Sequence, residues 1–224
     1  MPPEINGPRV DEDLAALADP VLADGSEWSG VEVTGDIGGS QDVAYVELSS
    51  SRLASVRLTG RRFDHLRLVD VLIEDSELSG ATLTGAHFTR VEFRRCRMSG
   101  LVASTLKARH VRFTECRADG ATFRMTRWDS AEFLHVDLRD ADFHAATFSG
   151  VRLLSCDLTG ADLSQATMAG TALHGSTVDN VRGADSLRGV VIGSDQVVPI
   201  AFPVFAAMGI VVDDDYFGPP ASAL

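Results

Sequence analysis

Lysine and cysteine are both scarce in this 224-residue chain, which contains a single lysine, Lys107, and three cysteines. A low and odd cysteine count is a poor basis for a disulfide framework, so we expect reduced thiols and a cytoplasmic location. No apolar run approaches the roughly 20 residues that cross a bilayer, and the polar start does not resemble a signal peptide, so we expect no membrane partner. The net charge of −12 argues against direct binding to nucleic acid, because phosphates require basic surface.

The main feature that the sequence does contain is a five-residue repeat. From Leu48 to Val178 every fifth residue is apolar, and the register never slips. A second, smaller apolar residue lies two positions earlier in most repeats, while the other three positions are mostly polar or glycine. Neither the helical period of 3.6 nor the strand period of 2 accounts for this pattern. Two inward residues and a three-residue step predict a short extended piece followed by a turn, repeated around a coil.

The glycines indicate how many sides the coil has. With one interruption, at Asp140, glycine takes the last position of the repeat at intervals of twenty residues: Gly60, Gly80, Gly100, Gly120 and Gly160. Because glycine tolerates positive φ, this column suits one corner of a four-sided coil of twenty residues. Side-chain volumes agree, since Trp128 would then lie over the small Ala108. Three phenylalanines would form one interior ladder: Phe93, Phe113 and Phe133.

Five-residue units such as 141–145 and 161–165 resemble those of the pentapeptide-repeat family. The resemblance extends over roughly residues 43–181 and implies an all-β fold, a right-handed quadrilateral β-helix. Arg61 departs from the pattern because it takes an inward-type position. The first coil is also poorly formed, with three residues at nominally inward positions that suit them badly: Asp36, Gly38 and Gln41.

The two ends of such a solenoid need caps, because they expose apolar core and unpaired strand edges. Residues 11–18 could form a short N-terminal helix with Asp11 as its N-cap. Residues 194–196 predict the start of a C-terminal helix that continues to Met208 and ends at Gly209. We therefore expect four parts: an N-terminal tail or cap at 1–27, the solenoid at 28–183, a C-terminal cap and dimerisation segment at 184–212, and a flexible tail at 213–224.

The expected C-terminal helix is apolar on every side, and such an element must be buried all round. Capping the solenoid covers only one side, so we expect a twofold homodimer joined at the C-termini. The residues expected at this interface are Val198, Ile200, Phe202, Val204, Phe205 and Met208.

This end of the chain also resembles the dimerisation segment of the pentapeptide proteins that protect DNA gyrase from fluoroquinolones. The shared features are the turn at residues 187–189, the pair Asp195 and Gln196, and the ending at 209–211. The resemblance implies a dimer of the same kind and a type II topoisomerase as a possible partner.

No catalytic, cofactor or metal site stands out in the sequence. The six histidines fall outside the inward positions and none lies twenty residues from another, so no two should converge on a metal. The three cysteines take small inward positions and are expected to be buried free thiols, although Cys96 and Cys116 would be neighbours. A solenoid with a filled interior has no deep pocket. We therefore expect that the protein is not an enzyme and binds no cofactor.

Charge is unevenly distributed along the chain. Residues 1–50 carry a net charge of −10, residues 51–130 carry +6 and residues 131–180 carry −5. In a twenty-residue coil, four basic residues of the middle coils form one column: Arg67, His87, Lys107 and Arg127. Six aspartates make the C-terminal coils acidic, and four of them stack in two columns: Asp129, Asp137, Asp140, Asp142, Asp157 and Asp162.

A dimer joined at the C-termini would bring these acidic coils together in the middle of a rod of roughly 70 Å. DNA carries about one charge per 1.7 Å, so such a rod could imitate a duplex toward a DNA-binding protein. The function expected from the sequence is a non-enzymatic DNA mimic that binds DNA gyrase or another type II topoisomerase. The alternative is a general protein–protein interaction scaffold with an unrelated partner, because a fold alone does not fix a function.

Overall fold

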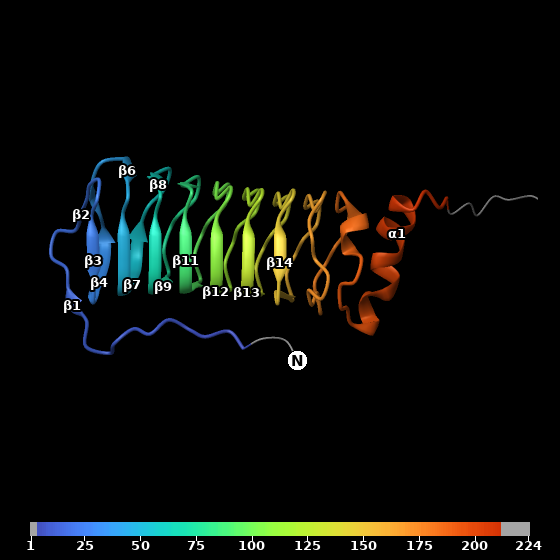
Figure 1. Cartoon of the computed structure of the whole chain (residues 1–224), viewed down its shortest axis with the longest axis horizontal. Coiled ribbons are helices and arrows are strands. Elements are labelled where there is room, and N and C mark those ends of the chain that lie inside the picture. The colour runs from blue at the N-terminus through green and yellow to red at the C-terminus, as the bar shows by residue number, and fades with distance from the viewer. Residues whose placement is uncertain (1–3, 212–224) are drawn as a thin grey trace, which may run out of the picture.

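In the computed structural model, which describes residues 4–211, the chain forms a rod of stacked coils that ends in a helix (Figure 1). The strands are β1 (Ala15–Ala16), β2 (Val21–Leu22), β3 (Glu27–Ser29), β4 (Val31–Asp36), β5 (Gly38–Gly39), β6 (Asp42–Ala44), β7 (Glu47–Arg57), β8 (Arg62–Asp64), β9 (Arg67–Glu74), β10 (Thr82–Thr84), β11 (His87–Arg94), β12 (Lys107–Thr114), β13 (Arg127–Leu134), β14 (Thr147–Ser149) and β15 (Arg152–Leu154). The helices are the short 3-10 helices η1 (Ala184–Leu187) and η2 (Ser194–Gln196) and the α-helix α1 (Val197–Ala207).

The coil contains twenty residues, as the glycine spacing predicts. Strands β7, β9, β11, β12 and β13 pair in parallel, and each residue lies beside the residue twenty positions further along the chain. Between strands, the backbone continues the same pattern, for example from the Leu78 N–H to the Arg97 carbonyl at 2.7 Å. The expected quadrilateral β-helix is therefore confirmed, with a short C-terminal helix at its end.

Every corner of the coil requires a left-handed backbone. The glycine column has positive φ throughout, from 63° at Gly120 to 72° at Gly160, and Asp140 takes the same conformation with φ 55°. A side chain at Gly160 would collide with Asp140, because its Cβ would lie 2.4 Å from the Asp140 Oδ1 atom. In four successive coils a second corner is formed without glycine, by Asp70, Arg90, His110 and Ser130, with φ between 52° and 56°, and glycine returns to this corner at Gly150 and Gly170.

The interior is filled by the residues of the five-residue register. Phe93 stacks on Phe113 with ring centroids 4.8 Å apart, so the predicted phenylalanine ladder is present. Trp128 lies beside Ala108 in the adjacent coil, also as predicted. The polar Thr126 takes an inward position because its hydroxyl accepts a hydrogen bond from the Trp128 indole at 2.8 Å and donates one to the Phe123 carbonyl at 2.7 Å.

The N-terminal segment forms no helix, so the expectation of a helix at residues 11–18 was wrong. Strand β1 lies there instead and pairs with β4, which places Ala15 beside Val31. An isolated helix of this length is marginal, whereas the edge of the first coil offers unpaired backbone groups. Residues 4–14 run along the side of the rod toward β1 (Figure 1). Their contact with it includes a hydrogen bond of 3.0 Å from the Arg9 N–H to Asp70.

The irregular first coil is explained by a shift in register. Thr34 pairs with Ala54, twenty residues on, but Asp36 pairs with Arg57, twenty-one residues on. This bulge turns Ile37 inward, where it is buried. Asp36, Gly38 and Gln41, the three residues that depart from the pattern in this coil, are all exposed.

Arg61 does point inward, at 5% exposure, and it has a structural role. Its guanidinium donates hydrogen bonds to the carbonyls of Ile37 at 2.7 Å and Gly38 at 3.3 Å. These bonds satisfy the buried guanidinium and tie it to the backbone next to the bulge. Burial lowers the pKa of Arg61.

The C-terminal cap follows the prediction closely. Helix η2 leads into α1, and Gly209 ends the helix with φ 71°. Gln196 is buried, and its side-chain amide donates to the carbonyls of Leu173 and Ser176, both at 2.6 Å, while its Oε1 accepts from the Gly193 N–H at 2.9 Å. The predicted flexible tail at 213–224 lies outside the described residues. No helix in the described part of the chain is long and apolar enough to span a membrane.

Candidate interaction surfaces

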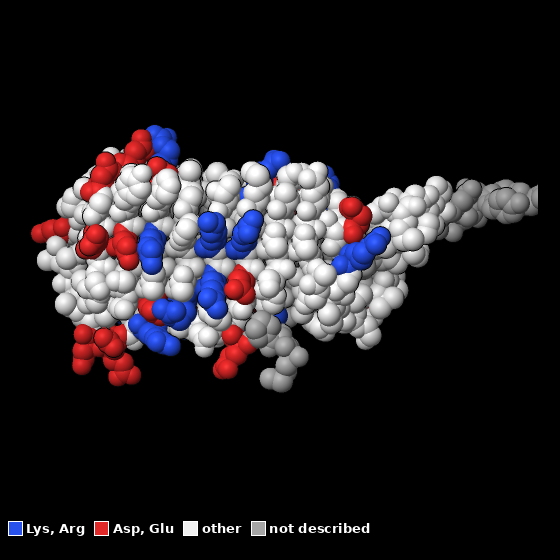
Figure 2. Space-filling view, viewed as in Figure 1, with Lys and Arg blue, Asp and Glu red and all other residues white. Residues whose placement is uncertain are grey.

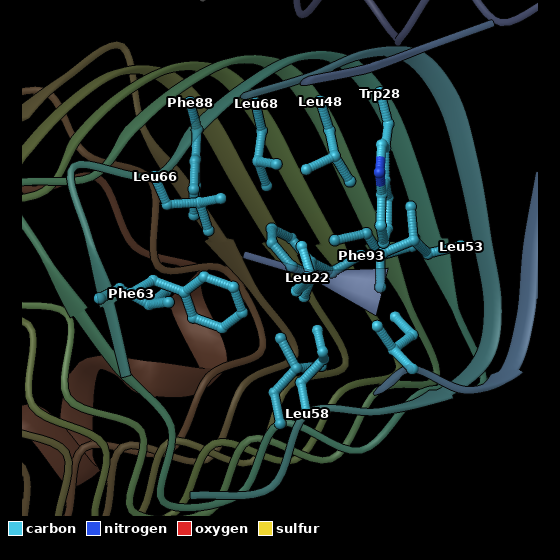
Figure 3. A pocket seen from close by; sticks show the side chains of 14 residues that line it. Leu22, Trp28, Leu48, Leu53, Leu58, Phe63, Leu66, Leu68, Phe88 and Phe93 are labelled. Atoms are coloured by element: carbon cyan, nitrogen blue, oxygen red, sulfur yellow. The ribbon is translucent and has the colours of Figure 1, made fainter. Parts of the chain in front are cut away.

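The interior of the solenoid contains a small apolar cavity in the N-terminal coils (Figure 3). Its volume is about 30 Å³, and its walls are apolar side chains such as Leu22, Leu58, Phe63 and Phe93. That volume is comparable to one water molecule, and the walls offer no hydrogen-bond partners. This cavity is a packing gap and not a ligand site, so candidate sites must lie on the outer surface.

The cysteines are buried free thiols, as predicted. Burial raises the pKa of Cys156 to about 11, so little of it is thiolate at neutral pH. The Cys96 thiol also has a raised pKa, because it lies beside the Cys116 thiol and is buried. Among residues 4–211, no three His, Cys, Asp or Glu side chains are grouped as metal ligands.

The structure brings the predicted acidic residues together in columns. Asp137 lies beside Asp157, and Asp142 lies beside Asp162, each pair one coil apart. Asp129 lies apart from them in β13, beside Arg109 of β12.

These aspartates have a local structural role that sequence spacing did not reveal. In both columns the side-chain Oδ1 atom accepts a hydrogen bond from the backbone N–H two residues further on. The donors, at 2.9 to 3.2 Å, are Arg139, His144, Thr159 and Ser164. Such bonds stabilise turns, so part of the preference for aspartate here comes from folding.

Arginines lie against most of the acidic residues. Arg139 donates two hydrogen bonds to the Asp137 carboxylate, at 2.6 and 2.8 Å, and they lower its pKa. The same arginine lies 3.8 Å from Asp157. Three further pairs join Arg124 to Asp142, Arg182 to Asp162 and Arg109 to Asp129. The surface around the columns is therefore less negative than the aspartates alone imply.

Helix α1 presents an apolar surface without charged side chains at the end of the rod. Of the residues predicted at the dimer interface, Val198 and Met208 are each 69% exposed, Phe202 is 61% exposed and Phe205 is 38% exposed. Ile200 is buried within the chain and Val204 is half-buried, and both pack against the end of the core. The expectation that Ile200 lies at a dimer interface was therefore wrong, because its side chain caps the solenoid of its own chain.

Two family models match the sequence. The model described as a pentapeptide repeat region matches residues 86–163, and the model described as pentapeptide repeats in eight copies matches residues 62–100 and 148–182. Together they cover more than half of the chain. This chain belongs to the pentapeptide-repeat family. No curated protein matches it.

The chain is also similar to two solved structures, one of which is described as a pentapeptide repeat protein and the other as a resistance protein. HetL, from the cyanobacterium Nostoc sp. strain PCC 7120, is described as involved in heterocyst differentiation regulation. It is 18% identical, with a TM-score of 0.37, and the match covers 76% of this chain and 91% of HetL. A trypsin-treated form of QnrB1, a plasmid-mediated fluoroquinolone resistance protein, is 16% identical, with a TM-score of 0.44 and coverage of 89% and 98%. At these identities and TM-scores, neither similarity identifies a partner of this pentapeptide-repeat protein.

Proposed function

We propose that this pentapeptide-repeat protein is a non-catalytic binder of DNA gyrase or another type II topoisomerase, toward which its acidic columns imitate a DNA duplex. The observation that supports this most directly is the stacking of Asp137 with Asp157 and of Asp142 with Asp162. Two columns with a rise of about 4.8 Å per coil give roughly one carboxylate per 2.4 Å of rod. Duplex DNA carries about one charge per 1.7 Å, so the two linear charge densities are comparable.

The arginines beside the columns reduce this negative charge, but their ion pairs with the aspartates are weak. The side chains of Arg139 and Arg182 are 46% and 63% exposed. Exposed ion pairs of this kind contribute about 0–1 kcal/mol each, because solvent screens them. Lysines and arginines of a DNA-binding partner can therefore replace these arginines at little cost.

A homodimer joined through α1 would extend the acidic surface. Helix α1 lies at the end of the rod (Figure 1), where a twofold axis can bring two copies together. Its apolar side chains Val198, Phe202 and Met208 are exposed. The acidic columns lie in the coils next to this end. Dimerisation would therefore place the columns of both copies near the centre of one long rod.

A supercoiling assay with purified gyrase tests the proposal, by titrating the protein with and without a fluoroquinolone. The test variant replaces Asp137, Asp142, Asp157 and Asp162 with Asn, which removes four charges but keeps an oxygen acceptor for each turn. The matched control replaces four aspartates at the other end of the rod with Asn: Asp19, Asp24, Asp36 and Asp42.

We expect inhibition of gyrase, or protection from the drug, by the wild type and the control, and loss of this effect in the column variant. An absence of any effect at protein concentrations up to about ten times a typical micromolar Kd would contradict the proposal.

The second candidate function is a scaffold for an unrelated protein partner. It is favoured by the ion pairs, since five of the six aspartates lie within 4 Å of an arginine. This function predicts that the protein has no effect on gyrase. It also predicts that the wild type and the column variant bind the true partner equally well.

A further inference from the structure

The middle coils carry a column of basic side chains that has no role in the proposed imitation of DNA. Arg67 of β9, His87 of β11, Lys107 of β12 and Arg127 of β13 are direct neighbours on adjacent strands. We call these four residues the basic stripe. Figure 2 shows basic side chains in a row along this face of the rod, with acidic ones toward the N-terminal end.

The basic stripe lacks the acidic partners that a neighbouring column of side chains has. That column contains Arg112, Glu132 and Arg152, and both arginines lie against Glu132, at 2.9 and 2.8 Å. In the stripe, only Arg67 approaches a carboxylate, that of Glu47 at 3.6 Å. Within residues 4–211, neither Lys107 nor Arg127 has a carboxylate within 4.0 Å. The stripe therefore holds cations without the counter-charge that Glu132 provides in the neighbouring column.

Like charges on adjacent strands repel each other and destabilise a sheet. The pKa of His87 is lowered, first by burial and then by the nearby positive charges of Lys107 and Arg67. The second effect is the expected result of repulsion between neighbouring cations. A shallow depression runs beside the stripe, lined in part by Thr89, Arg109 and Asp129. An anionic ligand lying in this depression would relieve the repulsion.

We propose that the basic stripe binds the acidic face of an α-helix of a partner protein, with the helix lying along the axis of the rod. The coils repeat at about 4.8 Å, as parallel strands do, and the 4.8 Å separation of the Phe93 and Phe113 rings agrees with this spacing. One turn of an α-helix rises about 5.4 Å, so acidic residues one turn apart stay within about 2 Å of register over three coils. Lysine and arginine side chains are flexible enough to absorb that difference.

An extended peptide fits the stripe less well. Its side chains return to the same face only about every 6.6–6.8 Å, and over three coils they would be displaced by roughly 6 Å. The spacing of the stripe therefore favours a helix over a strand as the ligand.

Nucleic acid also fits poorly. The stripe is only about 14 Å long and holds three permanent cations, whereas strong binding to phosphates needs many contacts. Glu27 and Glu47 continue the same column toward the N-terminus, where they would repel a longer polyanion. This surface lies apart from the acidic columns, and the inference does not rest on the proposed gyrase function.

The test uses a synthetic helical peptide of about five turns, with glutamates one turn apart along a single face of its central three turns, which match the length of the stripe. A control peptide of the same composition has its glutamates spread around the helix. Binding of both to the full-length protein is measured by fluorescence anisotropy at low salt. The test variant is Lys107→Glu with Arg127→Glu. The matched control is Arg97→Glu with Arg117→Glu, which changes another stacked pair one coil apart.

We expect the wild type and the control variant to bind the one-faced peptide at least about tenfold more tightly than the spread peptide, a difference of about 1.4 kcal/mol. The test variant should bind the one-faced peptide at least about tenfold more weakly than the wild type does. If it fails to fold by circular dichroism, the milder Lys107→Gln with Arg127→Gln serves in its place.

Three results would overturn the inference: no binding of the one-faced peptide by the wild type, equal binding by the stripe variant, or tighter binding of a DNA oligonucleotide of similar length than of the peptide.

Discussion

Phe113 lies parallel to Phe133 in the interior of the rod, with ring centroids 4.7 Å apart and an angle of 9° between the ring planes. Phe113 makes the same contact with Phe93 on its other side, at 4.8 Å. Its ring therefore fills the space between two coils, and no neighbouring side chain can replace it without breaking the stack.

Phe113→Ala should lower the free energy of unfolding by about 3–5 kcal/mol, because it removes buried apolar surface and leaves a cavity between rigid coils. Guanidinium denaturation followed by circular dichroism measures this loss. Thr114→Ala, at the adjacent outward position, serves as the control and should change stability by no more than about 0.5 kcal/mol. A loss below about 1 kcal/mol in Phe113→Ala would mean that the ladder contributes little.

Gln196→Leu should loosen the C-terminal cap while leaving the coils intact. The leucine has a similar volume, but it cannot donate to the carbonyls of Leu173 and Ser176. The Leu173 carbonyl still accepts from the Ser176 N–H at 3.0 Å, whereas the Ser176 carbonyl is left unsatisfied. One unsatisfied group costs about 1–3 kcal/mol, so amide hydrogens of α1 should exchange at least tenfold faster. Hydrogen exchange measured by mass spectrometry detects this, with the exposed Ser194→Ala as control. Unchanged exchange in α1 would show that the glutamine does not hold the helix in place.

Asp70→Asn should remove part of the acid sensitivity of the fold. Arg90 donates two hydrogen bonds to the Asp70 carboxylate, at 2.5 and 2.6 Å, and these lower its pKa despite the opposing effect of burial. A carboxylate whose pKa is lowered by folding stabilises the protein above its ordinary pKa of about 4, and this contribution is lost as the pH falls through the lowered value.

We therefore expect Asp70→Asn to cost about 1–3 kcal/mol at pH 7 and progressively less below about pH 4. Denaturation curves across this pH range measure the difference. Asp75→Asn is the matched control, because Asp75 forms a similar pair with Arg95 but is exposed, and so should lose less. The explanation fails if the wild type and Asp70→Asn differ by the same amount at every pH.

Phe202→Asp should convert the proposed dimer to a monomer, because it places a charge in the centre of the apolar face of α1. The molar mass from light scattering would halve, while the thermal melt of the solenoid should change little. Val21→Asp, at an exposed apolar residue near the opposite end, controls for a general effect of added charge. A wild type that is already monomeric, or a Phe202→Asp variant that stays dimeric, would exclude this interface.

The regular part of the fold could be predicted from the sequence because its period repeats many times. Each inward residue faces the same kind of environment in every coil, so the register from Leu48 to Val178 and the size of the coil follow from spacing alone. The pairing of Ala108 with Trp128 was predictable for the same reason.

The irregular parts could not be predicted in this way. The bulge at Thr34 and Asp36 changes the register by one residue. It occurs only once, so the repeat pattern of the sequence could not predict it. The ion pairs of the acidic columns join residues 2, 18 or 20 positions apart through long arginine side chains, whose directions are set by their surroundings. Sequence spacing found the aspartates but not the cations beside them.

The twenty-residue register also makes the rod a molecular ruler. Because each coil bonds only to the coils on either side, inserting twenty residues would lengthen the molecule by about 4.8 Å and leave both ends unchanged. Inserting five residues would instead rotate everything beyond the insertion by a quarter turn, so that the basic stripe and the acidic columns would face new directions relative to each other. The relative orientation of two binding faces in this protein is thus encoded by counting residues, independently of the chemistry of either face.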